Sequence, residues 1–188
     1  MLILSMIAKL VGLTKRNLIL NFRIKANYMN TDEHKQQVQG FMMFLGAIAD
    51  GLESVTGKGA GAVCFLAGRK VGLRRKVAQK ENDIMATLEA VKNEMKAMDI
   101  NWPFDINYKQ QSEFVIQHEG YQEIKLPFKN CIVRCTLFRY GVPQGKALCQ
   151  TKHGLFCGLF ENIYGAKTNL GIIHAGENAC LLNLKIFD

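Results

Sequence analysis

The sequence contains little proline, no low-complexity tract and no glycine- or proline-rich linker. Only three of its 188 residues are proline, whereas 48% are hydrophobic and 21% are charged. A chain of this composition buries enough apolar surface to fold, which excludes a largely disordered protein. Its length suits one domain, with room for an additional terminal element.

Targeting and cofactor signatures are missing as well. The apolar N-terminal segment MLILSMIAKLVGL is interrupted by Lys9, lacks a preceding basic region and a cleavage site, and is shorter than the roughly 20 residues of a membrane span. We therefore expect no signal peptide or membrane anchor, but a short helix docked on the domain or on a second copy. No nicotinamide, flavin or Walker fingerprint occurs, which argues against a self-contained reductase.

The six cysteines include no CxxC pair and no spacing typical of a secreted disulfide framework. We therefore expect reduced thiols and a cytoplasmic protein. The net charge is +8, and the densest basic cluster, GRKVGLRRKVAQK at 68–80, lies on one expected helix without interleaved exposed aromatic residues. This pattern favours a solvated face, so nucleic acid and membrane are not expected as partners.

Hydrophobic periodicity predicts helices first and strands afterwards. A helix is expected to begin at Thr31 and to end at Gly57, and others follow within GKGAGAVCFLAGRKVGLRRKVAQK at 57–80 and after an N-cap at Asn82. On the first helix one apolar stripe is expected to be buried: Val38, Phe41, Met42, Leu45, Ile48 and Leu52. Gly61, Gly68, Gly72, Gly154 and Gly158 are expected to allow close approach of helix backbones.

Beyond Pro103 the apolar residues recur every second position instead of every third or fourth. Strands are expected at 104–109, 113–119, 122–128, 130–138, 170–176 and 178–187, with a helix at 149–164 inserted among them. The predicted fold class is α+β, in which N-terminal helices pack on a C-terminal antiparallel sheet with one inserted helix. The predicted organisation is an apolar segment and connector at 1–30, followed by one domain at 31–188.

Cysteine and histidine residues provide the candidate chemistry. Strand parity places Cys131, Cys135 and Cys180 on inward faces, where a thiol commonly serves as a packing residue. Cys149 and His153 lie four residues apart on one helix, so both side chains can reach one ion. His174 and Cys180 follow on adjacent strands, and Cys with His ligands favour zinc or another transition metal. A catalytic Cys149–His153 pair is the alternative, but no third member is evident. No catalytic residue is assigned.

The residues CQTKHGLFCGLFENIYG at 149–165, followed by GENAC at 176–180 and a final apolar strand, resemble the C-terminal half of the 4-vinyl reductase-like, or hydrocarbon-binding, domain family. LESVTGKGAGAVCFLAGRKVG, at 52–72, resembles the helix, glycine turn and second helix of that family. The resemblance covers roughly residues 35–188. It implies a fold shared with nitric-oxide-sensing domains and with subunits of a Golgi tethering complex (TRAPP), a closed apolar ligand pocket, and a homodimer.

The resemblance also implies a structural zinc near the pocket, because aromatic-sensing regulators of this family hold zinc with a helix Cys, a Glu and two later Cys. Cys149 and Cys180 match two of these positions. Asn169 and Ile172 stand at the other two, so the zinc site of the family is not intact here. A rearranged site is predicted from Cys149, His174 and Cys180, with His153, Cys131 or Cys135 as fourth ligand.

The resulting functional prediction is a sensor or carrier for a small hydrophobic molecule, with its output through a partner protein. The predicted pocket walls are aromatic and aliphatic, as such pockets require, and plain core packing is the alternative role for each: Phe41, Phe44, Leu45, Phe65, Phe156 and Phe160. Two other functions stay open. One is an enzyme or accessory protein acting on a tetrapyrrole or another planar substrate, and the other is a scaffolding subunit.

Overall fold

The computed structural model describes residues 31–106, 115–131, 133–134, 137, 141, 147–176 and 179–188. The expected apolar segment and connector at 1–30 lie outside the described residues. The chain divides into two compact units, 1–41 and 42–188, so the division falls inside the first described helix. Among the described residues, no helix combines the length and apolar character needed to cross a membrane.

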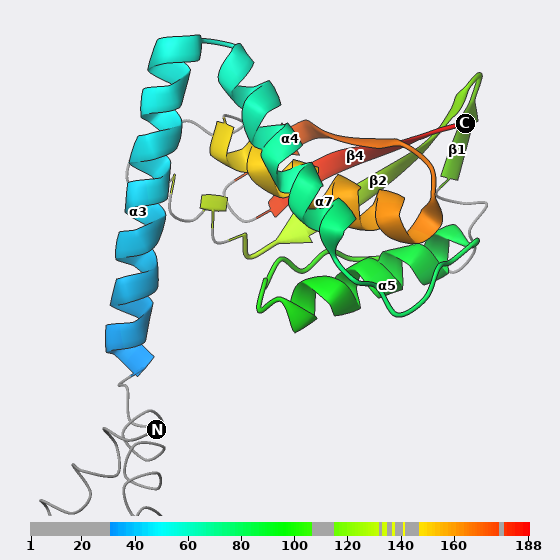
Figure 1. Cartoon of the computed structure of the whole chain (residues 1–188), viewed down its shortest axis with the longest axis horizontal. Coiled ribbons are helices and arrows are strands. Elements are labelled where there is room, and N and C mark those ends of the chain that lie inside the picture. The colour runs from blue at the N-terminus through cyan, green and yellow to red at the C-terminus, as the bar shows by residue number, and fades with distance from the viewer. Residues whose placement is uncertain are drawn as a thin grey trace, which may run out of the picture. The chain divides into compact units, whose positions relative to one another are not determined.

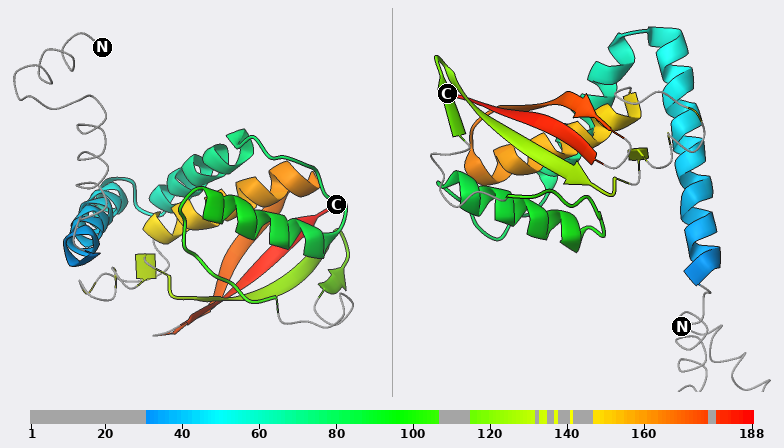
Figure 2. Two further views of the ribbon diagram at one scale, coloured as in Figure 1. Left: turned by 90° about the horizontal axis from the view of Figure 1, so that it is seen from below. Right: turned by 180° about the vertical axis from the view of Figure 1, so that it is seen from behind.

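The fold is α+β, as the sequence predicts. Four strands form an antiparallel sheet in the order β1-β2-β4-β3, with β1 at Val115–His118, β2 at Tyr121–Lys129, β3 at Thr168–Ala175 and β4 at Ala179–Phe187. The helix α7 (Ala147–Tyr164) is inserted before β3. Helices α5 (Ile84–Ala97) and α7 lie over one face of this sheet, and α4 (Gly59–Arg74) lies beside α7 (Figures 1 and 2).

The first helix, α3 (Thr31–Thr56), ends where the sequence predicts, at Gly57, whose φ of 57° ends the helical conformation. The prediction of one buried stripe on it holds only in part. Met42 and Leu52 are partly buried and pack against core residues, whereas Phe41 and Ile48 are 64% and 67% exposed. The sequence pattern identifies an apolar stripe correctly, but it does not show whether another element packs against it.

Two further sequence predictions need correction. The N-cap of α5 is Asp83 instead of Asn82, since the Asp83 carboxylate accepts a hydrogen bond from the Ala86 amide at 2.8 Å. The expected strand at 130–138 is also wrong: β2 ends at Lys129, Asn130 has a φ of 49°, and Val133, Arg134 and Leu137 are helical. Val133 and Leu137 are still buried, because residues four apart share one face of a helix as well as of a strand. Cys135 lies outside the described residues.

The core lies between the sheet and its helices. On β2 and β4, residues two apart form the buried face of the sheet: Ile124, Leu126 and Phe128 of β2 and Leu182, Leu184 and Ile186 of β4. Trp102 stacks on Phe128 with ring centroids 4.2 Å apart, and Phe156 of α7 meets Phe128 edge-on at 5.7 Å. Aromatic side chains therefore fill the space between α7 and the sheet.

Glycines bring α4 and α7 into backbone contact. A Cβ atom on Gly154 would overlap the carbonyl oxygen of Phe65, and one on Gly68 would overlap that of Thr151. Gly72 and Gly158 face backbone atoms of the opposite helix in the same way. The predicted close approach is confirmed at these four positions. Gly61 lacks such a constraint, since its nearest neighbour would be the Gln150 Cγ atom at 3.5 Å.

Side chains from neighbouring helices satisfy the ends of this helix pair. Glu53 of α3 accepts a hydrogen bond at 2.5 Å from the amide of Ala147, the first residue of α7, where a carboxylate also suits the positive end of the helix dipole. At the other end, the Asn162 amide donates to the carbonyl oxygens of Gly72 and Arg75 at 3.3 and 2.7 Å. These bonds fix the register of α4 along α7.

Candidate ligand-binding cavity and adjoining groove

A small cavity lies where the N-terminal half of α7 faces β3 and β4. Its volume is about 20 Å³, which is room for a single water molecule. Part of its wall is aromatic or aliphatic and consists of Trp102, Ile172 and Leu182. The rest carries nitrogen or sulfur atoms and consists of Cys131, Arg134, Cys149, Lys152, His153 and Cys180. The cavity therefore combines an aromatic wall with several polar groups that are largely shielded from solvent.

Lys152 lies in this wall with a sulfur atom and an aromatic ring as neighbours. Its Nζ atom is 2.6 Å from Cys131 Sγ and 3.8 Å from the centroid of the Trp102 ring. Among the described residues it forms no ion pair with a carboxylate. Burial lowers the pKa of Lys152, and a negative charge on Cys131 acts in the opposite direction. The amine is thus placed against a thiol at the edge of the cavity.

Two residues of the cavity wall carry a buried polar atom without a partner among the described residues, His153 at Nδ1 and Arg134 at Nε. His153 is 3% exposed, and its imidazole lies parallel to Trp102 with the centroids 6.2 Å apart. Burial, together with the nearby Lys152, lowers its pKa to about 4, so the imidazole is neutral at physiological pH. Its Nδ1 atom is buried without a hydrogen-bond partner among the described residues. A buried polar atom left in this state indicates a place for a water or a ligand.

Three cysteines line the same cavity. Cys131 is buried, and Cys149 and Cys180 are half-buried. Burial raises the pKa of Cys180, and the nearby Cys131 raises it further. The fourth described thiol of this region, Cys157, is fully buried elsewhere in the core, and burial raises its pKa to about 12. Cys157 is therefore a packing residue, as expected from the sequence.

The structure brings together some of the predicted metal ligands. Cys149, Cys180, His153 and Cys131 all line the cavity, whereas His174 is exposed on β3 beside Gly176 and is not part of the cavity wall. Ile172, which stands at the position of a family ligand, does line the cavity. Among the described residues, no three Cys, His, Asp or Glu side chains are placed to hold a metal ion together.

The predicted pocket walls fall into three environments. Phe156 and Phe160 are fully buried in the aromatic core, and Leu45 is half-buried on α3. Phe44 is 65% exposed, and Phe41, in the other unit, is exposed as well. Phe65 of α4 lines an open groove together with Leu66. Within the unit 42–188, Phe44, Leu45, Phe65, Phe156 and Phe160 thus do not line one closed pocket.

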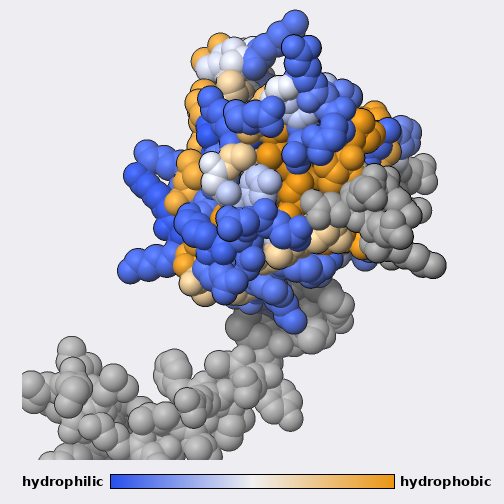
Figure 3. Space-filling model, turned by 90° about the vertical axis from the view of Figure 1, so that its right-hand side faces the viewer, coloured by the Kyte–Doolittle hydropathy of each residue, from blue (hydrophilic) through white to orange (hydrophobic). Residues whose placement is uncertain are grey.

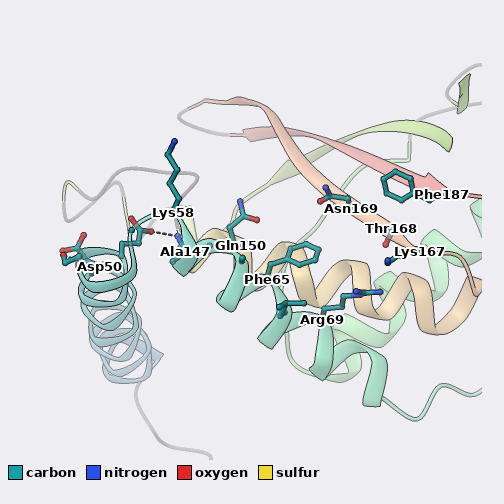
Figure 4. Close-up of a pocket in the computed structure, with 16 residues that line it drawn as sticks. Asp50, Lys58, Phe65, Arg69, Ala147, Gln150, Lys167, Thr168, Asn169 and Phe187 are labelled. Carbon is teal, nitrogen blue, oxygen red and sulfur yellow. Dashed lines mark hydrogen bonds between the residues drawn. The ribbon is translucent and has the colours of Figure 1, made fainter. Parts of the chain in front are cut away.

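The open groove has a volume of about 1210 Å³ and lies along α4, between the end of α3 and the edge of the sheet. Figure 4 shows Phe65 and Arg69 of α4 on one side of it and Asn169 of β3 on the other. Arg69 donates a hydrogen bond at 2.7 Å to Glu161, which is buried and also accepts from the Thr168 amide at 2.7 Å. This ion pair joins α4, α7 and β3 at the floor of the groove.

Three residues of the cavity are not identified by the sequence patterns. Trp102 belongs to an irregular segment, and no sequence pattern assigns a role to Arg134 or Lys152. A usable signal exists only for Lys152, which lies three residues after Cys149 and therefore on the same side of α7. The partners of Trp102 and Arg134 depend on contacts between distant segments.

The architecture is α+β, with helices packed on a four-stranded antiparallel sheet. A solved structure with the same fold is the phenol-responsive sensory domain of the transcription activator PoxR with phenol, at 12% sequence identity and a TM-score of 0.56. The similarity covers 78% of this chain and 74% of the PoxR domain. No protein-family model and no curated protein sequence matches the chain.

Proposed function

We propose that the chain is a ligand-binding sensor or carrier domain whose ligand is a small aromatic molecule with a hydroxyl group. The observation that carries this proposal is the unpaired Nδ1 atom of His153 in a small cavity beside the Trp102 ring. A neutral imidazole nitrogen accepts a hydrogen bond from a hydroxyl, while an aromatic ring packs against the tryptophan. The phenol-responsive PoxR domain, which has the same fold, supports phenol as the first ligand to test.

A ring-sized ligand requires the cavity to widen, because the present space accommodates one water molecule. Two residues of the cavity wall can move with a small loss of free energy. Ile172 lies on the edge strand β3 next to a β-bulge, and the long side chain of Lys152 has several rotamers. Binding then selects an open arrangement of these walls, which is the conformational difference that a sensor needs.

The chain carries its own reporter, since Trp102 is its single tryptophan. Titration with phenol is expected to change Trp102 fluorescence to saturation and to raise the melting temperature. His153→Phe removes the acceptor but keeps a flat ring, and we expect it to weaken phenol binding by about 5- to 10-fold, the value of one hydrogen bond. Phe65→Leu, in the open groove, is the matched control and is expected to leave binding unchanged.

Two results would contradict the proposed ligand. One is a Trp102 signal that does not respond to phenol. The other is a His153→Phe variant with unchanged affinity for phenol. Toluene separates the contributions of ring and hydroxyl, since it should bind the native protein and the His153→Phe variant equally.

Zinc bound by the same cluster is a second proposal. The donors are of the right chemistry, since Cys131, Cys149, Cys180 and His153 line one cavity. In the described arrangement, however, no three of them converge on one point, so a bound ion requires them to move. Elemental analysis tests this directly: Cys149→Ser should lower the zinc content, while Cys64→Ser, outside the cavity, should not. A native protein without metal would refute it.

The exposed apolar surface of the helices favours assembly with a second copy, so we also propose a homodimer. On α4, Val63, Leu66, Val71 and Leu73 are 44–58% exposed, and on α3 Phe44, Ile48 and Val55 are 65–85% exposed. Apolar side chains at this density are typical of an interface. The face of the molecule in Figure 3 is mainly hydrophilic and also shows an apolar patch. A partner protein that receives the signal is an alternative occupant.

A further inference from the structure

The contact between Lys152 and Cys131 is unusually short for its chemistry. Nζ and Sγ are 2.6 Å apart, which is less than the about 2.9 Å of an ordinary N–H···O hydrogen bond, although sulfur is larger than oxygen. The two groups come from different elements, α7 and the segment that follows β2. Both are nucleophiles when deprotonated, and the fold places them in direct contact.

Neighbouring groups hold this pair in place. The Lys152 ammonium or amine group lies over the Trp102 ring, and Cys131 also accepts a hydrogen bond from the Arg134 amide at 3.5 Å. Cys131 is 7% exposed, and a small, partly open cavity adjoins both side chains. A small uncharged oxidant can therefore reach the sulfur atom, whereas larger reagents are excluded.

From this contact, we propose that Lys152 and Cys131 form a covalent cross-link through one oxygen atom, Nζ–O–Sγ, when the protein is exposed to hydrogen peroxide. A bent oxygen bridge holds nitrogen and sulfur apart by about the separation that they already have. A direct S–N bond, in contrast, requires the two atoms to move closer together. The cross-link would tie α7 to the segment after β2, and it does not depend on a ligand in the cavity.

The chemistry balances in two steps. First, the Cys131 thiol is oxidised by one molecule of peroxide to the sulfenic acid, and one water is released. Second, the sulfenic acid, the Lys152 amine and another peroxide give the S–O–N bridge and two waters, so that the N–H and O–H bonds break and the N–O bond forms. Four electrons in total pass from the pair to two peroxide molecules. An excess of a small thiol reductant returns these four electrons. The products are the free Lys152 amine, the free Cys131 thiol, water and two disulfides of the reductant.

Peptide mapping of the full chain by mass spectrometry tests the proposal. After peroxide treatment and alkylation of the remaining thiols, we expect a linked pair of peptides containing Lys152 and Cys131. Its mass should exceed the sum of the two free peptides by one oxygen atom and fall short by two hydrogen atoms. Treatment with a thiol reductant should separate the pair again.

Matched variants assign the bond. Lys152→Gln and Cys131→Ser should each abolish the linked pair, whereas Cys149→Ser and Cys180→Ser, in the same cavity wall, should retain it. A disulfide between Cys131 and another cysteine would overturn the proposal. So would sulfinic acid on Cys131 with an unlinked Lys152, or an unmodified pair at a peroxide dose that oxidises exposed methionines. The native protein alone decides between these outcomes, even if a variant fails to fold.

Discussion

Gly154 of α7 lies directly against the carbonyl group of Phe65 in α4, and no space for a methyl group remains between them. Two helices approach this closely only where neither has a side chain at the crossing. The contact is made by backbone atoms, which cannot change rotamer to accommodate a larger residue. Substitution at the crossing therefore separates the helices.

We expect Gly154→Ala to lower the free energy of unfolding by about 2–3 kcal/mol, in spite of the better helix propensity of alanine, because overpacked cores lose stability on this scale. Urea unfolding measures the change. Gly51→Ala on α3 is the matched control, since its Cβ meets nothing within 4 Å. This control should be neutral or stabilising by up to about 1 kcal/mol. Equal effects of the two substitutions would contradict the backbone contact.

The free energy of unfolding should decrease as the pH is lowered, because of His153. Its pKa is about 4 in the folded protein and about 6.5 when unfolded, so between these values the unfolded chain binds the additional proton. A histidine with a lowered folded pKa stabilises the fold fully above pH 6.5, and this contribution is lost as the pH falls toward 4. The full loss is about 3 kcal/mol.

Urea unfolding between pH 5 and 7 isolates this effect from most carboxylates. His153→Phe should flatten the pH dependence in that window, and His118→Gln, at an exposed position, should leave it unchanged. A His153→Phe variant with the same slope as the native protein would show that another group is responsible.

Cys157 should resist alkylation in the folded protein. It is 0% exposed, and burial raises its pKa to about 12, so at pH 8 almost no thiolate is present. Mass mapping after brief iodoacetamide treatment should find Cys157 unmodified and the half-buried Cys64, Cys149 and Cys180 modified. Denaturant should remove the difference. Rapid labelling of Cys157 in native buffer would contradict its position in the core.

The proposed homodimer depends on the exposed face of α4. Val63 is 54% exposed, and replacing it with lysine should raise the dimer dissociation constant by at least about 10-fold, since a charge is then buried in an apolar interface. Light scattering across a concentration series measures the change. Lys70→Ala, on the same helix and exposed, is the control. A native protein that is monomeric at all concentrations would refute the proposal.

The sequence predicts the fold class, the inserted helix and the glycine contact, because each depends on local spacing. Gly154 and Gly158 lie four apart, as do Gly68 and Gly72, so each pair occupies one helical face. The strand at 130–138 is predicted wrongly because its apolar spacing of four fits a helix equally well. Burial of the α3 stripe depends on which element covers it, and an amphipathic pattern does not contain that information.

In the candidate site, too, the sequence predicts only the residues whose positions follow from local spacing. Cys149 and His153 are placed correctly on one side of a helix by their spacing, and Cys180 by strand parity. Trp102 and Arg134 reach the cavity through contacts across the sheet and from an irregular segment, where no period exists to reveal them. The Lys152–Cys131 contact depends on where the chain turns after β2, which only the folded structure shows.

The backbone contact between α4 and α7 has a mechanical consequence. Cys149, Lys152 and His153 project from α7 into the cavity, while Gly154 and Gly158 on the same helix press against α4. No side chains lie between the two helices at this contact that could change rotamer when one helix moves. The two helices must therefore move together as one rigid body. A ligand that displaces α7 by a fraction of an ångström would therefore deliver nearly the same displacement to the exposed outer face of α4.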